Sequence, residues 1–141
     1  MIIADAGFFY ALADASDVWH TRAKRALPTQ SEGWITTWPV LTEATHLLTR
    51  WIGPDAAHAL LRDVAAGGIA VWQWAEPQTE RLAHLMERYA SLPMDLADGS
   101  LVLLAEHLGH GRILTTDERD FGAYRFKNRA PFHNLLAGTG H

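Results

Sequence analysis

Apolar and polar residues follow two different patterns along this chain. Short apolar runs predict buried strands, whereas apolar residues recurring every three or four positions predict helices with one face on a core. Strands are expected at residues 2–4, 33–37, 69–74 and 112–115, with one edge strand near 124–126. Helices are expected at residues 8–13, 16–27, 39–51, 55–66, 77–89 and 95–108. Alternation of this kind predicts an α/β fold, a three-layer α/β/α sandwich around a mostly parallel sheet.

Capping and breaking residues set the expected ends of these helices. Ser16 is a suitable N-cap for the second helix, and Pro28 ends it. Pro39 suits the first turn of the third helix. That helix is expected to bury one stripe of side chains, formed by Val40, Ala44, Leu47, Leu48 and Trp51.

Length and composition limit the classes of protein to consider. The chain has 141 residues, of which 48% are hydrophobic and 20% charged, and it has no cysteine. We expect a single domain over residues 1–137, with residues 138–141 as a disordered tail. The missing cysteines exclude disulfides and thiolate zinc sites, and they agree with a cytoplasmic location. The N-terminus does not have the pattern of a signal peptide, and no apolar run has the roughly 20 residues of a membrane span.

Two aspartates follow predicted strands closely. Asp5 comes directly after the first strand, and Asp117 comes just after the strand around Ile113. The carboxyl ends of parallel strands form the binding crevice of an open α/β sheet, so the two side chains are expected to meet there. The alternative is that each aspartate only caps the helix or turn that follows it.

Three further acidic residues lie on predicted helices. Glu43 falls on the apolar stripe of its helix, so it either reaches solvent at the rim of the stripe or meets a cation. Asp95 and Asp98 are three residues apart at the start of a helix and share one face. Capping explains Asp95 well, but it explains less well why Asp98 continues the inward stripe.

Four carboxylates at one crevice repel each other unless a cation lies between them. Asp5, Glu43, Asp98 and Asp117 would each raise the pKa of the others. Ligands that are all oxygen suit Mg²⁺ or Mn²⁺, and such ions support phosphoryl chemistry by activating water and neutralising charge. A purely structural metal ion is the alternative.

Five segments of the chain form an ordered set. Three lie in the C-terminal half: MDLADGSLV at 94–102, ILTTD at 113–117 and Asp120-Phe121. Two lie in the N-terminal half: IIAD at 2–5 and LTEA at 41–44. Together these segments resemble the PIN-domain ribonucleases, and the size of the chain resembles the VapC toxins of toxin–antitoxin pairs. The resemblance covers almost the whole chain, from Asp5 to about Phe126.

The resemblance implies Mg²⁺- or Mn²⁺-dependent cleavage of single-stranded or loop RNA. It makes Asp5, Glu43, Asp98 and Asp117 the catalytic, metal-binding quartet. Water activated by the metal would attack the scissile phosphate and leave a 3′-hydroxyl and a 5′-phosphate, with Glu43 positioning water or helping as a base. The family's accessory positions fall on Asp95, Thr115 and Asp120. The likeness also implies a VapB-like antitoxin and a homodimer.

Two positions depart from the family pattern. Ala6 stands where a small hydroxyl residue is common, so any contact made by that hydroxyl is absent here. Gly99 replaces the usual alanine after Asp98, and glycine within a helix costs about 0.5–1 kcal/mol relative to alanine. Neither change removes an acidic residue.

The charge and the aromatic residues bear on partners. A net charge of −4 is unusual for an RNA-binding protein, which predicts modest, salt-sensitive affinity. Arg119 and Arg112 are the candidate phosphate contacts, with plain surface charge as the alternative. Phe8, Phe9 and Trp19 predict either core packing or a groove for a partner helix. The eight histidines form no metal-binding pair of the HExxH kind and are interpreted as structural or surface residues.

Two other functions remain open at this point. A receiver-like domain that handles phosphate with Mg²⁺ also gathers aspartates at strand ends, but it needs a lysine after a late strand. The two lysines of the chain are Lys24 and Lys127, and neither has that context. A PIN-like module that binds RNA or protein without cutting is the other alternative. The sequence does not specify the RNA target or the preferred metal.

Overall fold

Five short parallel strands form the central sheet of the computed structural model, which describes residues 1–137. The order across the sheet is β3-β2-β1-β4-β7. Every neighbouring pair in this order is parallel. The strands are β1 (Ile2–Ala4), β2 (Trp34–Thr37), β3 (Ile69–Trp72), β4 (Arg112–Leu114) and β7 (His133–Asn134). The tail expected at residues 138–141 lies outside the described residues.

Seven α-helices connect these strands in the described part of the chain. They are α1 (Ala6–Ala13), α2 (His20–Arg25), α3 (Trp38–Trp51), α4 (Pro54–Ala65), α5 (Thr79–Arg88), α6 (Leu96–Leu108) and α7 (Glu118–Ala123). Two 3₁₀ helices, η1 (Leu27–Glu32) and η2 (Glu76–Gln78), precede β2 and α5. A small antiparallel hairpin, β5 (Arg125–Phe126) with β6 (Ala130–Pro131), lies apart from the sheet.

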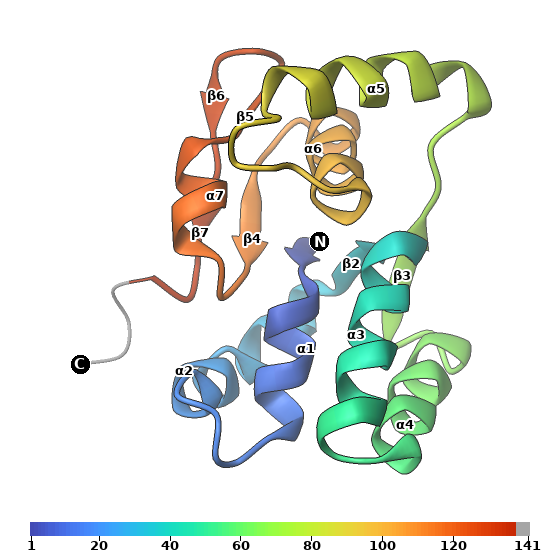
Figure 1. Cartoon of the computed structure of the whole chain (residues 1–141). Helices are drawn as coiled ribbons and strands as arrows, with labels where there is room; N and C mark the ends of the chain where they lie inside the picture. The colour runs from blue at the N-terminus through green and yellow to red at the C-terminus, as the bar shows by residue number, and fades with distance from the viewer. Residues whose placement is uncertain (138–141) are drawn as a thin grey trace.

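The direction of each crossover places the helices on the two faces of the sheet. The chain moves from β1 to β2 to β3 in one direction and then returns past β1 to β4. Crossovers between parallel strands are right-handed, so α1 to α4 cover one face and the helices after β3 cover the other. Figure 1 shows α1 to α4 gathered in one half of the molecule and α5 to α7 in the other. The three-layer α/β/α sandwich is therefore confirmed.

Helix α6 lies inside the protein rather than at its surface. The sequence predicts one buried stripe, but every residue from Gly99 to Ala105 is buried, because α5 and β5 pack on the side of α6 that faces away from the sheet. Gly99 makes the contact with α5 close. A Cβ atom there would lie 2.5 Å from Cδ1 of Leu82, which gives a packing reason for the absence of alanine.

Three local predictions are wrong. Ser16 does not cap a helix: its backbone N–H and hydroxyl both donate to Asp14, and α2 begins only at His20. Trp51 is 63% exposed at the last residue of α3, where Arg50 covers its ring, and Leu41 is buried in the stripe instead.

The third wrong prediction concerns the edge of the sheet. Residues 125–126 pair with 130–131 in the separate hairpin, and the edge strand beside β4 is β7. A strand of two residues is too short to show alternation in a sequence. None of the helices within residues 1–137 is long and apolar enough to cross a membrane.

Candidate functional site

Asp5 and Asp117 lie where the order in which the chain adds strands to the sheet reverses. The chain leaves β1 toward β2 on one side and reaches β4 on the other, which makes the gap between β1 and β4 the topological switch point. Ligands of open α/β sheets bind outside the carboxyl ends of the strands at this point. Asp5 follows β1 directly, and its backbone N–H donates to the carbonyl of Leu114 at 3.0 Å. Asp117 follows β4 three residues after that carbonyl.

Thr115 joins these two aspartates. Its hydroxyl donates to Oδ2 of Asp5 at 2.7 Å, and its Oγ1 accepts the backbone N–H of Asp117 at 3.0 Å. The side chain of Asn134, on β7, pairs with both backbone groups of Thr115, at 3.0 and 3.3 Å. The accessory threonine is therefore a fixed bridge across the switch point.

A glycine permits the close approach of the two loops. A Cβ atom on Gly7, in the first turn of α1, would lie 2.0 Å from Oγ1 of Thr116. Thr116 stands between the bridging threonine and Asp117. The first turn of α1 can therefore lie against the β4–α7 loop only because residue 7 has no side chain.

Helix α6 brings a second pair of acids to the same end of the sheet. Asp95 is its N-cap, accepting the backbone N–H of Asp98 at 2.8 Å. The carboxylate of Asp98 accepts a hydrogen bond from the hydroxyl of Tyr124 at 3.0 Å. Tyr124 is fully buried, with its ring edge-on to Phe121 and Tyr89 at 5.1 Å each. Tight packing of the ring thus fixes the hydroxyl that holds Asp98.

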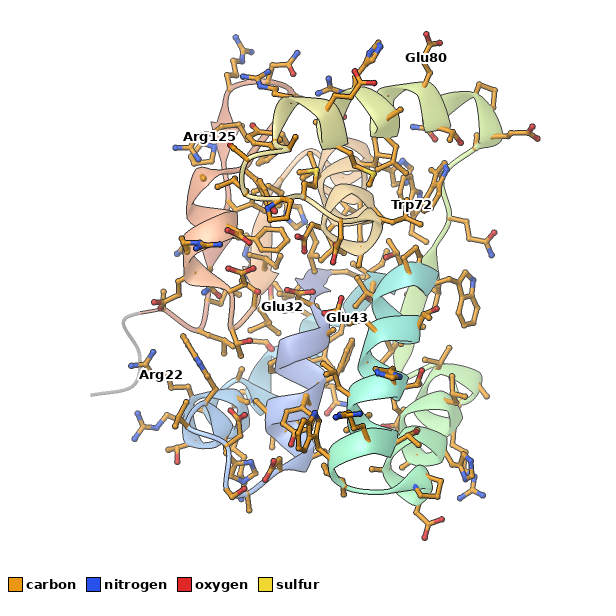
Figure 2. The ribbon with its side chains drawn as sticks, in the orientation of Figure 1. Arg22, Glu32, Glu43, Trp72, Glu80 and Arg125 are labelled. Atoms are coloured by element: carbon orange, nitrogen blue, oxygen red, sulfur yellow. The ribbon has the colours of Figure 1, made fainter. Side chains whose placement is uncertain are left out.

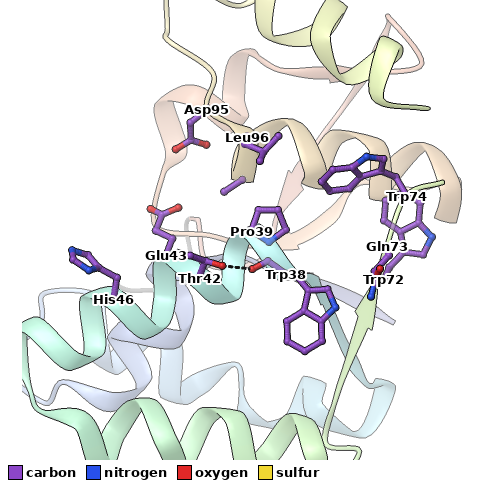
Figure 3. A pocket seen from close by; sticks show the side chains of 11 residues that line it. Trp38, Pro39, Thr42, Glu43, His46, Trp72, Gln73, Trp74, Asp95 and Leu96 are labelled. Atoms are coloured by element: carbon purple, nitrogen blue, oxygen red, sulfur yellow. Dashed lines mark hydrogen bonds between the residues drawn. The ribbon is translucent and has the colours of Figure 1, made fainter. Parts of the chain in front are cut away.

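Glu43 approaches from α3, on the opposite side of the site. The residue is exposed at the rim of the apolar stripe, where its carboxylate remains open to a cation. Figure 3 shows its carboxylate turned toward Asp95. A hydrogen bond of 2.6 Å between the buried hydroxyls of Thr37 and Ser100 ties the start of α3 to the first turns of α6. This bond sets the spacing of the helices that carry Glu43 and Asp98.

An aspartate of this site can cap a helix and also point its carboxylate toward the other acids. Asp5, Asp95 and Asp117 are the N-caps of α1, α6 and α7. Each cap uses the Oδ1 oxygen, with donor distances of 2.8, 2.8 and 3.0 Å. A cap of this kind fixes the orientation of the carboxylate while its second oxygen stays available for other contacts.

The pKa values show that these acids share one electrostatic environment. Burial, followed by the charges of Asp117 and Asp95, raises the pKa of Asp5 to about 6 against the lowering effect of its hydrogen bonds. Burial and the charges of Asp95 and Asp5 raise the pKa of Asp98 to about 8. Burial and the charges of Asp5, Asp95 and Asp117 raise the pKa of Glu43 to about 7, an effect that solvent screens at this exposed residue. Burial also raises the pKa of Asp117.

No ion pair within residues 1–137 neutralises the quartet of Asp5, Glu43, Asp98 and Asp117. Burial raises the pKa of Asp117, although the charge of Arg119 lowers it. Carboxylates that raise one another's pKa and form no ion pair have the donor chemistry that a hard divalent cation requires.

The spacing of the acids limits how such an ion would be held. In the part of the chain that is described, no three carboxylate, imidazole or thiol groups come close enough together to form a ready metal cage. Mg²⁺ commonly uses one or two carboxylates and keeps several of its waters. The four residues therefore fit an ion that remains largely hydrated.

The other candidates of the site lie in different places. Asp120 is buried beside Asp117 and forms an ion pair with Arg119 at 3.0 Å. Arg119 itself is mostly exposed at the edge of the site. Arg112 is at the beginning of β4, so the structure does not bring it to the acids, and it pairs with Glu32 at 3.0 Å. Figure 2 shows Glu32 and Glu43 among the side chains of the molecule.

The aromatic residues near the N-terminus are mostly core. Phe8 and Phe9 are buried, and Phe8 packs edge-on against Trp34 at 5.0 Å. Trp19 is half-buried, with the guanidinium of Arg22 over its ring at 4.7 Å. The core interpretation therefore holds for the two phenylalanines.

A pocket of about 810 Å³ opens beside the acids. Glu43 and Asp95 form one end of it, and Trp38, Trp72 and Trp74 line the rest together with apolar residues of α3 and α6 (Figure 3). Glu43 and Asp95 therefore belong both to the acidic site and to the lining of this pocket.

Sequence reasoning missed Tyr124 and Asn134. Both lie in the C-terminal segment, after the motifs that drew attention, and neither belongs to a recognisable spacing. Their roles depend on packing between distant parts of the chain: Tyr124 contacts a residue 26 positions away, and Asn134 one 19 positions away. The one available signal for Tyr124 was its position three residues after the Asp120-Phe121 pair.

We expect Tyr124→Phe to weaken metal binding and any reaction that depends on Asp98. The hydroxyl stabilises the charged form of Asp98, so its loss raises the pKa of that carboxyl further. Changes to residues that orient metal ligands typically cost about 10–100-fold in affinity or activity. Calorimetric titration with Mg²⁺ between pH 6 and 9 measures both the loss and its shift toward higher pH.

Tyr89→Phe is the matched control for this substitution. The Tyr89 hydroxyl accepts the backbone N–H of Arg125 at 3.1 Å, and within residues 1–137 it makes no hydrogen bond to an acidic residue. Its removal costs about 0.5–1.5 kcal/mol of stability and leaves Mg²⁺ affinity unchanged. Equal Mg²⁺ affinity in both variants would contradict a positioning role for Tyr124.

Comparisons with known proteins agree with this geometry. The family model described as PIN domain matches residues 2–127. Ribonuclease VapC26 of Mycobacterium tuberculosis is 27% identical over 124 residues, which cover 88% of this chain and 92% of the relative. The crystal structure of Mycobacterium tuberculosis VapC20, described as a sarcin–ricin loop cleaving toxin, superposes with a TM-score of 0.77 at 23% identity. That match covers 84% of this chain and 92% of the other.

Proposed function

Because the chain belongs to the PIN domain family, we propose that it is a metal-dependent endoribonuclease, the VapC-type toxin of a toxin–antitoxin pair. One observation carries the proposal: Asp5, Glu43, Asp98 and Asp117 converge at the switch point of the sheet, and none of them forms an ion pair within the described residues. The name of the mycobacterial relative, a ribonuclease, supports RNA as the substrate, and the structural neighbour is described as a sarcin–ricin loop cleaving toxin.

The side chains of the site have separable roles in this proposal. Thr115 and the capping bonds hold Asp5 and Asp117 in place, and Tyr124 holds Asp98. Mg²⁺ or Mn²⁺ held at the quartet by one or two of its carboxylates would activate water and neutralise charge on the phosphate. Glu43, a carboxylate at the exposed rim of the site, would position the attacking water or accept a proton from it. Arg119 is placed to contact a phosphate at the edge of the site.

The order of the strands argues against a receiver-like domain. Receivers share the flavodoxin-like order 2-1-3-4-5, whereas this sheet has β3-β2-β1-β4-β7. A non-cleaving PIN-like module is the remaining alternative, and it is distinguished only by activity.

The proposal extends to partners and location. We expect a VapB-like antitoxin and a homodimer, because both accompany the VapC resemblance, and a cytoplasmic site of action, where RNA is present. Exposed apolar side chains of α4 and of the turn before it offer surfaces for such contacts: Ile52 and Leu61. Light scattering after size-exclusion chromatography measures the oligomeric state.

Incubation of the purified chain with total RNA tests the function directly. We expect discrete fragments with 5′-phosphates in Mg²⁺ or Mn²⁺, their complete loss in EDTA, and recovery when Mn²⁺ exceeds the chelator. Cleavage that persists in EDTA would contradict metal dependence. Absence of cleavage by folded protein, with both ions and with ribosomal, transfer and messenger RNA present, would favour the non-cleaving module.

A further inference from the structure

The tryptophan-lined pocket beside the acids is not used by the reaction described above. Its lining combines three indole rings with Pro39, Leu96 and Ala97, and it contains no lysine or arginine. Its volume of about 810 Å³ falls within the range of pockets that hold small organic groups.

Two of the tryptophans are held rigidly. Trp72 stacks on the ring of His107, with centroids 5.1 Å apart and planes at 26°. The indole N–H of Trp74 donates to Oγ1 of Thr79 at 3.1 Å. Rings fixed in this way lose little conformational entropy when a ligand binds.

Trp38 is different, because neither a stacked ring nor a hydrogen bond holds its indole within residues 1–137. Trp38 is 45% exposed at the first residue of α3. Its backbone carbonyl accepts the hydroxyl of Thr42, so the main chain there is nevertheless fixed. Leu96, on the facing helix, is also 45% exposed. A large apolar surface at a pocket mouth commonly marks a binding site.

The chemistry of the lining selects among ligands. No lysine or arginine in the lining attracts phosphate groups, and Glu43 and Asp95 disfavour them unless a cation is bound at the acids. A neutral aromatic group satisfies the lining best, since indole rings stack on nucleobases of any identity. Gln73 and His46 add polar groups at the wall that can bond to base edges.

We propose that this pocket binds an unstacked nucleobase of single-stranded RNA, next to the phosphate that lies over the acids. Figure 3 shows the two ends of the site, with Glu43 and Asp95 facing each other and Trp72 and Trp74 beyond Leu96. An RNA strand that places a phosphate at the acids therefore has an adjacent base within reach of the tryptophans. The proposal rests on the proposed ribonuclease function for its substrate, and it adds where a base is held.

Binding of a labelled hexaadenylate tests the proposal by fluorescence anisotropy. Asp98→Asn protein in Mg²⁺ is used so that the RNA stays intact. A strand of equal length and charge that lacks bases is the reference. We expect hexaadenylate to bind on the order of tenfold more tightly than the baseless strand, and Trp38→Ala to remove this difference. Trp38→Phe should retain part of it, because a phenyl ring still stacks.

Trp51→Ala is the matched control, since it removes another exposed tryptophan from the same helix. Trp51 is the last residue of α3 and lies about 20 Å along the helix from Trp38. We expect it to bind both strands as the parent does. Equal affinity of the parent for the two strands, or an unchanged difference in Trp38→Ala, would overturn the proposal.

Two further outcomes separate this inference from others. If light scattering shows that Trp38→Ala converts a dimer into a monomer, the pocket is an interface with a second copy of the chain, and the proposal is overturned. If the wild-type chain cleaves RNA while Trp38→Ala binds hexaadenylate normally, the ribonuclease stands and the base pocket fails. If hexaadenylate binding depends on Trp38 but no RNA is cleaved, the pocket stands and the ribonuclease fails.

Discussion

Asp98→Asn is expected to abolish RNA cleavage and, at the same time, to make the metal-free protein more stable. The loss of activity follows from removing one negative charge from the quartet that would hold the metal. Removal of a single preorganised electrostatic group costs about 10²–10³-fold in rate in other enzymes, and we expect a loss of about 10³-fold here. Single-turnover cleavage of a fixed RNA fragment measures this loss.

The gain in stability has a separate cause. Burial and the charges of Asp95 and Asp5 raise the pKa of Asp98 to about 8, so folding near neutral pH must either bind a proton or hold an unfavourable charge. Asparagine has the same shape, still accepts the Tyr124 hydroxyl, and carries no charge. We expect the Tm of the metal-free protein to rise by a few degrees at pH 7, at roughly 2–4 °C per kcal/mol for a chain of about this size.

Asp63→Asn serves as the control for both measurements. Asp63 is exposed on α4, away from the strand ends that carry the acids. We expect unchanged cleavage and a Tm within about 1 °C of wild type, since surface substitutions usually change stability little. If Asp98→Asn lowered both activity and Tm, the carboxylate would be part of a stabilising contact rather than of a metal site.

The sequence was most informative where chemistry and strand ends coincide. Asp5 and Asp117 follow apolar runs that could be recognised as strands, and the rule that ligands bind at the carboxyl ends of parallel strands brings them together without knowledge of the strand order. The position of Asp98 was predictable from helix periodicity, because its spacing from Leu101 continues the inward face of the predicted helix.

Features that depend on distant packing could not be predicted. The burial of α6 on all sides arises from α5 and β5, which cover its outer face, and a periodic stripe in the sequence does not reveal that cover. Arg112 lies near Asp117 in the sequence, yet the strand between them points the two residues to opposite ends of the sheet. The bridging role of Thr115 could not be predicted either, because it depends on a hydrogen bond to Asp5, which lies 110 positions away in the sequence.

The metal-free protein is expected to lose stability as pH rises from about 5 to about 8. The folded-state pKa values of about 6, 7 and 8 for Asp5, Glu43 and Asp98 exceed the usual value near 4 for an unfolded chain. The folded protein therefore binds more protons than the unfolded chain in this range. The free energy of unfolding falls with rising pH wherever this holds, and it levels off above the highest folded-state pKa. Subtracting the Tm of Asp98→Asn from the Tm of the wild type at each pH isolates the contribution of Asp98 from that of other titrating groups.

Mg²⁺ is expected to reverse this loss, and to do so more strongly at higher pH. Protons and the cation compete for the same carboxylates, so the affinity for Mg²⁺ increases as Asp5, Glu43 and Asp98 lose their protons. An ion present at about 100 times its Kd stabilises the folded state by about 2.7 kcal/mol, a rise in Tm on the order of 5–10 °C. The rise is measured by calorimetry with and without MgCl₂ at pH 6, 7 and 8, with NaCl of equal ionic strength as the control. A Tm that responds to Mg²⁺ and NaCl alike, or a Mg²⁺ effect that does not increase with pH, would show that the acids do not hold the ion.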